Sequence, residues 1–301
     1  MTEDSPYEIH DPRFRRLIHP SARLERIATG FRWAEGPVWF PAMGCLLFSD
    51  IPENRMMRWT EDGQLGLFRA PADFANGNTR DRQGRLVTCH HGTRSVVRTE
   101  HDGTRTILAD RFAGQRLNSP NDVVVRSDGS IWFTDPTYGI MSDYEGHAAP
   151  REQAANRVYR IDPASGEVAA VSEDFVQPNG LAFSPAEDIL YVAESGSSHD
   201  PAVPAVIRAY PVAGDRLGPG RDFATIDSGL PDGFRLDRSG NLWSSAADGV
   251  HVFSPEGVLL GKIRTPETVA NLTFGGRRGH RLFIAATTSV YAVYVEAAGA
   301  V

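Results

Sequence analysis

The chain has 301 residues, and its 31 basic and 38 acidic side chains leave a net charge of −7. The basic residues are scattered and form no block interleaved with aromatic residues, which argues against a nucleic-acid groove. No run approaches the roughly 18 consecutive apolar residues of a membrane-spanning helix, and the polar first ten residues do not resemble a secretion signal. Because two cysteines cannot form a disulfide framework, we expect a reduced, cytoplasmic protein.

The first expected strand is "RLERIATGF", Arg23–Phe31. Residues 1–22 precede it as an N-terminal extension, in which Tyr7–Ser21 is expected to be irregular or a short helix on the outside of the fold.

From Glu35 onward, one pattern recurs six times. Each copy has an Asp, Asn or Glu, a short strand, a turn with Gly or Pro, and a second apolar strand; the copies begin at Glu35, Asn76, Asn121, Asn179, Asp232 and Asn271. Consecutive copies begin about 40–60 residues apart, close to the repeat length of propeller blades. The sequence therefore predicts an all-β, six-bladed β-propeller that forms a single domain over residues 1–301.

Two copies carry polar insertions, at Tyr138–Asn156 in the third blade and Ser195–Ala205 in the fourth. Loops that outgrow a repeat are frequent sites of function.

The sixth copy ends with "RLFIAATTSVYAVYVE", which supplies a second and a third strand but is short of a fourth. We therefore expect Arg23–Phe31 to be the outer strand of the sixth blade and to close the ring, which removes an exposed sheet edge.

The six starting residues are expected to surround one mouth of the central channel, because the first strand of each blade lines that channel. All six offer side-chain oxygens, and Glu35 and Asp232 are carboxylates. Hard divalent cations such as Ca²⁺ take such ligands, whereas a zinc site with imidazole ligands would need histidine. Asn and Asp also favour turns, but Glu35 is a poor turn residue, so the set favours a metal site.

An antiparallel hairpin returns the end of the second strand to the level at which the first strand began. His91 and Tyr138 follow second strands, and the insertion after Ser195 would bring His199 over the same mouth. These side chains are candidates to bind a substrate or to hold the metal ligands in place.

The segments "AEGPVWF", "SPNDVVVRSDGSIWFTDPTYG", "PNGLAFS" and "LPDGFRLDRSGNLW" resemble the gluconolactonase/regucalcin (senescence marker protein) family of six-bladed propellers, and bacterial gluconolactonases fit best. The resemblance implies metal ligands at Glu35, Asn179 and Asp232. It also implies that Asn121 lies at the metal or binds substrate, and that Asp232 is the acid/base.

These expectations together describe a metal-dependent hydrolase that opens a small-molecule sugar-acid lactone. The ion would stabilise the oxyanion while Asp232 takes the proton of the attacking water. Ca²⁺ is the favoured ion, although Zn²⁺, Mn²⁺ and Mg²⁺ accept the same ligands. Two alternatives remain open: a hydrolase of another lactone, an aryl ester or a phosphotriester at the same site, and a non-catalytic, protein-binding propeller. The sequence leaves the oligomeric state open.

Overall fold

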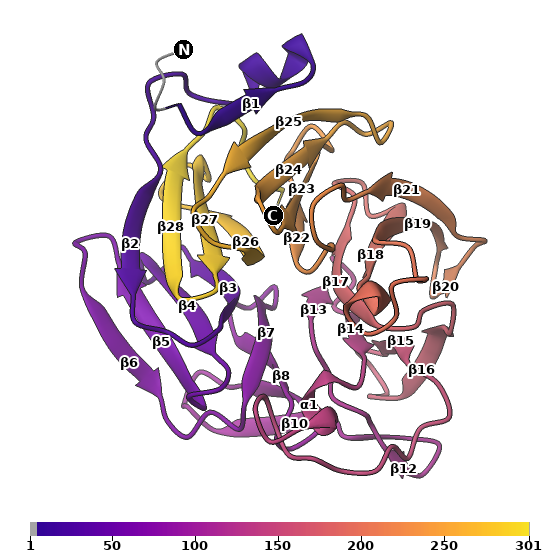
Figure 1. Ribbon diagram of the computed structural model, residues 1–301. Coiled ribbons are helices and arrows are strands. Elements are labelled where there is room, and N and C mark those ends of the chain that lie inside the picture. The colour runs from indigo at the N-terminus through magenta and orange to yellow at the C-terminus, as the bar shows by residue number, and fades with distance from the viewer. Residues whose placement is uncertain (1–4, 301) are drawn as a thin grey trace.

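The computed structural model describes residues 5–300 and contains six antiparallel sheets arranged as the blades of a ring (Figure 1). The all-β, six-bladed β-propeller is therefore confirmed. Within residues 5–300, no helix has the length and apolar character needed to cross a membrane.

The first three blades follow one another along the chain. Blade one contains β3 (Ala34–Phe40), β4 (Cys45–Asp50), β5 (Arg55–Thr60) and β6 (Leu65–Arg69). Blade two contains β7 (Ala75–Arg80), β8 (Leu86–His90), β9 (Ser95–Thr99) and β10 (Arg105–Ala109), and a hairpin of β11 (Arg111–Phe112) and β12 (Gln115–Arg116) follows it. Blade three contains β13 (Val123–Val125), β14 (Ile131–Asp135), β15 (Arg157–Ile161) and β16 (Val168–Ser172), with α1 (Tyr138–Met141) in its insertion.

The last three blades complete the ring. Blade four contains β17 (Pro178–Phe183), β18 (Ile189–Glu194), β19 (Val206–Ala213), β20 (Arg216–Leu217) and β21 (Arg221–Thr225), with the 3-10 helix η2 (Gly196–Ser198) in its insertion. Blade five contains β22 (Phe234–Leu236), β23 (Leu242–Ala246), β24 (Gly249–Phe253), β25 (Leu259–Arg264) and β1 (Tyr7–Ile9). Blade six contains β26 (Val269–Gly275), β27 (Arg281–Ala286), β28 (Ser289–Tyr294) and β2 (Glu25–Thr29).

The ring closes as predicted. β2 is the outer strand of blade six and pairs antiparallel with β28, with Glu25 opposite Ala292 and Thr29 opposite Ser289. Figure 1 shows β2 running down the outer edge of this blade beside β28.

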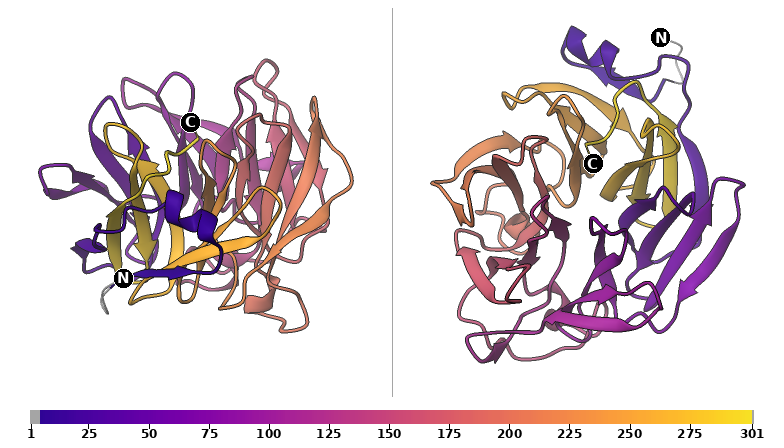
Figure 2. Two further views of the ribbon diagram at one scale, coloured as in Figure 1. Left: turned by 90° about the horizontal axis from the view of Figure 1, so that it is seen from above. Right: turned by 180° about the vertical axis from the view of Figure 1, so that it is seen from behind.

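The N-terminal extension differs in part from the expectation. It contains the short 3-10 helix η1 (Pro12–Arg16), but β1 also adds a strand to the edge of blade five, with Tyr7 opposite Ile263. Both elements lie on the outside of the ring (Figure 2). Tyr7 and Phe14 are buried in the apolar cluster that joins blades five and six, which explains why this segment is held against the ring.

The core lies between neighbouring blades rather than at the centre of the ring. Trp39 of blade one stacks on Phe283 of blade six, with ring centroids 5.3 Å apart. Trp132 of blade three contacts Phe183 of blade four edge to face, and the fully buried Trp243 of blade five joins the cluster of blade six. Each blade is thus covered on its faces by the apolar side chains of its neighbours.

The innermost strands also touch through their main chains at one mouth of the ring. The Gly180 N–H donates to the carbonyl oxygen of Asp232 at 2.9 Å, which joins blade four to blade five. The Gly77 N–H likewise donates to Asn121 O at 2.8 Å, between blades two and three. A Cβ atom on Gly180 would overlap with the Asp232 carbonyl, so this approach requires glycine.

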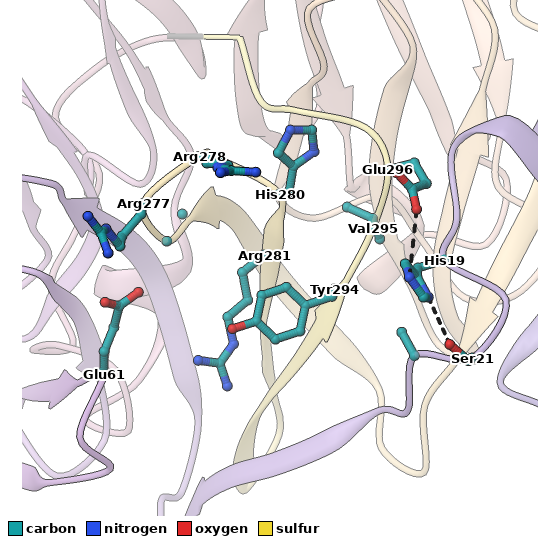
Figure 3. Close-up of a pocket in the computed structure, with 13 residues that line it drawn as sticks. His19, Ser21, Glu61, Arg277, Arg278, His280, Arg281, Tyr294, Val295 and Glu296 are labelled. Carbon is teal, nitrogen blue, oxygen red and sulfur yellow. Dashed lines mark hydrogen bonds and ion pairs between the residues drawn. The ribbon is translucent and has the colours of Figure 1, made fainter.

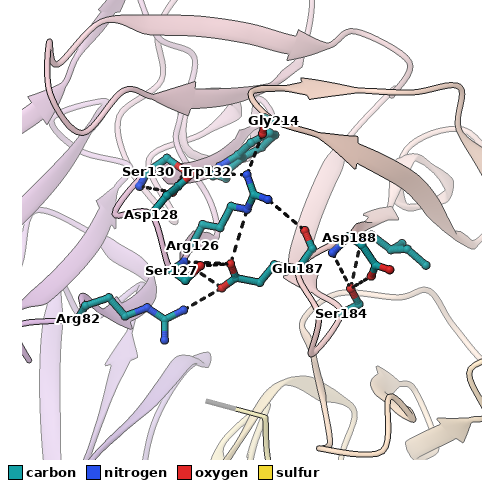
Figure 4. Close-up of polar contacts among 11 residues, drawn as sticks. Arg82, Arg126, Ser127, Asp128, Ser130, Trp132, Ser184, Glu187, Asp188 and Gly214 are labelled. Atoms are coloured by element: carbon teal, nitrogen blue, oxygen red, sulfur yellow. Dashed lines mark hydrogen bonds and ion pairs between the residues drawn. The ribbon is translucent and has the colours of Figure 1, made fainter.

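At the opposite mouth, a network of ion pairs and hydrogen bonds around Glu187 joins blades two, three and four (Figure 4). The Glu187 carboxylate accepts hydrogen bonds from Arg82 at 2.9 Å and from the Ser127 main-chain N–H at 2.9 Å, and it lies 3.6 Å from Arg126 Nε. These partners come from equivalent turns of three blades, so one carboxylate ties the three turns together.

The main-chain contact between blades four and five can be tested with Gly180→Ala. The added methyl group must push apart two packed strands, and overpacking of this kind costs about 3 kcal/mol. Urea denaturation is expected to show a corresponding loss in the free energy of unfolding. Gly66→Ala is the matched control, because a Cβ at Gly66 in β6 meets open space. Equal stabilities for the two variants would contradict this account.

Candidate functional site

Four of the innermost strands are irregular at the mouth where the main chains of neighbouring blades touch. In blades one, two, four and six the pairing of the first strand with the second shifts register at its start: between Glu35 and Val38, Ala75 and Asn78, Pro178 and Leu181, and Val269 and Asn271. Such bulges re-aim side chains at a sheet edge. The predicted ring residues of these four blades (Glu35, Asn76, Asn179 and Asn271) therefore lie where the regular alternation of the strand is interrupted.

Glu35 is buried at this mouth with its carboxylate held in a fixed position. Its Oε2 atom accepts hydrogen bonds from the Gly36 main-chain N–H and from Asn271 Nδ2, the latter at 3.0 Å. The Asn271 Oδ1 atom accepts the Leu272 N–H at 2.8 Å, so both ends of this amide have partners within the protein. Asn271 thus orients Glu35 across the junction of blades six and one.

Burial raises the pKa of Glu35 from 4.5 to about 8, and the nearby negative charge of Asp122 adds to the increase. Burial also raises the pKa of Asp232 well above its ordinary value, and the charge of Glu35 is the next contributor. A hydrogen bond from the Asn179 side chain partly opposes this shift. Contacts between the blades also bring these residues to one mouth. Gly180, which follows Asn179, bonds to the main-chain oxygen of Asp232, and the Asn271 side chain that binds Glu35 packs against Gly233.

The chemistry of this group fits a divalent cation. Two desolvated carboxyl groups repel each other when both are ionised, and a cation between them would relieve that repulsion. The carboxylate and amide oxygens are the ligands that hard cations prefer.

Two further asparagines belong to the ring. Asn121 is buried, its main-chain oxygen accepts the Gly77 N–H, and its side chain has no hydrogen-bond partner among residues 5–300. Asn76 Nδ2 donates to His91 Nε2 at 3.2 Å.

His91 is fully buried, and both of its ring nitrogens are engaged. Because Nε2 accepts from Asn76, Nδ1 carries the proton and donates to the main-chain oxygen of Glu145 at 2.9 Å. Burial lowers the pKa of His91 to about 4, so the imidazole is neutral at physiological pH. A direct contact between His91 and a substrate would require one of these bonds to break.

Tyr138 and His199 meet where the two insertions touch. The Tyr138 hydroxyl lies 3.2 Å from Ser195 O and 3.0 Å from Ser198 Oγ, and its ring is 5.5 Å from that of the exposed His199. Burial raises the pKa of Tyr138, and the charge of Asp232 adds to the increase. The charge of Asp232 thus acts on Tyr138, and the exposed His199 lies beside the Tyr138 ring.

Two acidic residues that the sequence analysis did not select also influence the mouth. Asp122 follows Asn121, is buried, and lies 3.5 Å from Arg235 Nη1. Glu145, in the insertion of blade three, contributes to the raised pKa of Asp232. The neighbour of a predicted ligand could have been noticed in the sequence, but no periodicity marks Glu145 within its polar loop.

Among residues 5–300, one cluster of three potential metal ligands does not include any of the six predicted ring residues. The Asp227 and Asp248 carboxylates and the His251 imidazole approach within 4.8 Å of one another in blade five. Lys262 Nζ already lies 2.7 Å from Asp227 and 3.3 Å from Asp248, and Arg264 pairs with Asp248. Lys262 and Arg264 thus already neutralise the two carboxylates of this cluster, so it does not need a metal ion for charge balance.

A cavity of about 1040 Å³ also lies away from the ring residues, between the N-terminal extension and the turn that joins β26 to β27 (Figure 3). Its lining includes His19, Arg278 and Arg281 but none of the six ring residues. The turn is at the far end of blade six from Asn271, so this cavity is separate from the carboxylate mouth.

Comparisons with known proteins agree with this architecture. Residues 33–288 match the SMP-30/gluconolactonase/LRE-like region. The chain is 33% identical to a gluconolactonase of Zymomonas mobilis, over 96% of this chain and 85% of that protein. It is 28% identical to the pentonolactonase XacC of Haloferax volcanii, over 83% and 80% of the two chains.

The solved structure of a gluconolactonase from Xanthomonas campestris superimposes with a TM-score of 0.91 at 39% identity, over 97% of this chain and 95% of that one. The match to the family extends over all six ring residues and over both insertions. The chain belongs to the SMP-30/gluconolactonase/LRE-like family.

Proposed function

We propose that this protein is a metal-dependent lactone hydrolase that opens the ring of a sugar-acid lactone, as a gluconolactonase does. The observation that carries the proposal is the convergence of the buried Glu35 carboxyl group and the half-buried Asp232 carboxyl group with the Asn179 amide at one mouth of the ring. Its relatives named gluconolactonase and pentonolactonase support the reaction class. Two desolvated acids placed close together destabilise the folded protein, and a propeller that only bound other proteins would not need them.

Glu35, Asn179 and Asp232 are proposed to hold one divalent ion, with Ca²⁺ favoured by the all-oxygen ligands. Asn121 is proposed as a further ligand or a substrate contact. The bound ion would polarise the lactone carbonyl. Asn271 keeps the Glu35 carboxylate in position from one side. His91 holds Asn76 and the insertion of blade three in position through its two ring nitrogens.

Asp232 is proposed to act as the acid/base. Its carboxylate takes the proton of the attacking water, and it returns that proton to the ring oxygen when the acyl–oxygen bond breaks. The Asp232 main-chain N–H donates to Ser245 Oγ at 2.8 Å, which fixes the backbone of this residue. Tyr138 is proposed to contact the same substrate.

Metal removal tests the cofactor. After EDTA treatment and gel filtration, we expect hydrolysis of glucono-1,5-lactone, corrected for the uncatalysed rate, to fall about 100-fold or more. Addition of Ca²⁺, Mn²⁺ or Zn²⁺, each alone, should identify the ion that restores it. Full activity in the metal-free protein, verified by elemental analysis, would contradict the proposal.

Asp232→Asn tests the acid/base. The variant keeps the shape of the side chain but cannot carry the proton, so kcat is expected to fall about 10²–10⁴-fold while the melting temperature is retained. Asp227→Asn is the matched control, since it removes an exposed carboxylate from the separate cluster in blade five. Near-normal turnover in Asp232→Asn would remove Asp232 from the mechanism.

The raised pKa of Glu35 predicts how stability depends on pH when no metal is bound. Between the ordinary value of 4.5 and the folded value of about 8, the folded protein holds a proton that the unfolded chain has released. Stability in EDTA should therefore decrease as the pH rises through this range, and saturating metal should reduce the decrease. Thermal melts at pH 5.5 and pH 8 measure it. Glu35→Gln removes the titrating group, and an unchanged pH dependence in this variant would refute the assignment.

A further inference from the structure

A second cavity lies at the mouth of the ring opposite the proposed metal site. It has a volume of about 770 Å³, and all six innermost strands contribute to its lining: Val38 of β3, Arg80 of β7, Val124 of β13, Phe183 of β17, Leu236 of β22 and Phe274 of β26. The turns that carry Arg82, Ser127 and Glu187 also line it (Figure 4). None of the six predicted ring residues is part of this lining, so the cavity is separate from the carboxylate mouth.

The charged side chains of this cavity are mainly basic. Among residues 5–300, four arginines and two acids line it: Arg80, Arg82, Arg235 and Arg238, and Asp81 and Glu187. Both acids already have basic partners, because Asp81 accepts a hydrogen bond from Arg85 Nε at 2.6 Å and Glu187 accepts one from Arg82 at 2.9 Å. The charge that remains at the cavity is therefore positive, although the chain as a whole carries a net charge of −7.

Two of the four arginines lack a counter-ion. Within residues 5–300, the side chains of Arg80 and Arg238 take part in no hydrogen bond or ion pair. Arg80 is half-buried, and its pKa is lowered by burial and by the nearby charge of Arg82. A partly desolvated cation that lies near another cation and has no counter-ion destabilises the folded protein.

The backbone or the side chain of the other two arginines is fixed by contacts within the protein. Arg235 Nη1 donates to the main-chain oxygen of Phe234 at 2.7 Å and lies 3.5 Å from the buried Asp122. The Arg238 N–H donates to Ala298 O at 2.9 Å, which holds the start of its side chain at the rim. The cavity thus has basic groups in defined positions before any ligand binds.

An oxyanion would supply the negative charge that this cavity lacks. A guanidinium group binds a carboxylate or a phosphate through two parallel N–H···O bonds. The cavity is larger than a single inorganic ion requires, and its volume lies within the range of roughly 300–1,000 Å³ that is typical of small-molecule sites. The apolar side chains of Val124, Phe183 and Leu236 would contact the uncharged part of such a molecule.

We propose that this arginine-lined cavity binds a small organic oxyanion, a molecule of about the size of a monosaccharide that carries a carboxylate or a phosphate group. Arg80 and Arg238 pair with the anionic group. The inference goes beyond the proposed lactone hydrolase function and does not depend on it, because the cavity shares no residue with the proposed metal site.

Calorimetric titration of the full chain tests this proposal. Gluconate is the carboxylate probe, glucose 6-phosphate is the phosphate probe, and sorbitol is an uncharged polyol of similar size. Each is titrated into wild type, Arg80→Gln, Arg238→Gln and Arg277→Gln. Arg277 is the matched control, because it is an exposed arginine that lines the cavity beside the N-terminal extension and has no ion pair among residues 5–300.

We expect saturable binding of at least one of the two anions to wild type, with a Kd of about 1 mM or below, and no binding of sorbitol. Arg80→Gln and Arg238→Gln should each weaken binding about 10-fold at an unchanged melting temperature, because each removes a charge-assisted hydrogen bond. Arg277→Gln should bind as wild type does. The anion that binds more tightly identifies the acidic group that the site prefers.

Other outcomes overturn the proposal and locate its error. The absence of saturable binding for both anions would refute the site, as would wild-type affinity in both Arg80→Gln and Arg238→Gln. Loss of binding in Arg277→Gln alone would place the anion in the cavity beside the N-terminal extension. Loss of binding in Asp232→Asn, with Arg80→Gln unaffected, would place it at the carboxylate mouth instead.

Discussion

The contact between the main chains of neighbouring innermost strands is the constraint on which the rest of the structure depends. At the junction of blades four and five, the Gly180 N–H reaches the carbonyl oxygen of Asp232, the residue that is proposed to act as the acid/base. A side chain at Gly180 would separate these strands. The same glycine that permits close packing of the ring therefore also sets the position of Asp232.

Close packing at the mouth has an electrostatic consequence. Because the blades approach so closely, Glu35 of blade one and Asp232 of blade five are desolvated within range of each other, and the pKa values of both increase. Interblade packing of apolar side chains, such as Trp39 on Phe283, stabilises the ring in which this repulsion is held. The fold thus holds the two carboxyl groups close together despite their repulsion. A bound cation would relieve this repulsion and so stabilise the folded protein.

The sequence was sufficient to predict the architecture because the repeated strand pattern states both the number of blades and the missing outer strand of the last one. It did not predict β1, since a three-residue strand pairs only because Tyr7 and Phe14 are buried beside it. At the site, the recurring sequence pattern identified the six ring residues but not the role of each one. Whether an amide such as Asn271 offers its oxygen or orients a neighbouring carboxylate depends on contacts between blades. The position of Glu145 depends on the folding of a loop that no periodic pattern describes.

The most direct test of the central claim is anomalous diffraction from a crystal soaked in Mn²⁺, a substitute for Ca²⁺ that can be located without ambiguity. The account predicts a single strong peak about 2.1–2.4 Å from oxygens of Glu35, Asn179 and Asp232. A peak among Asp227, Asp248 and His251, or no peak at the mouth of the ring, would contradict it.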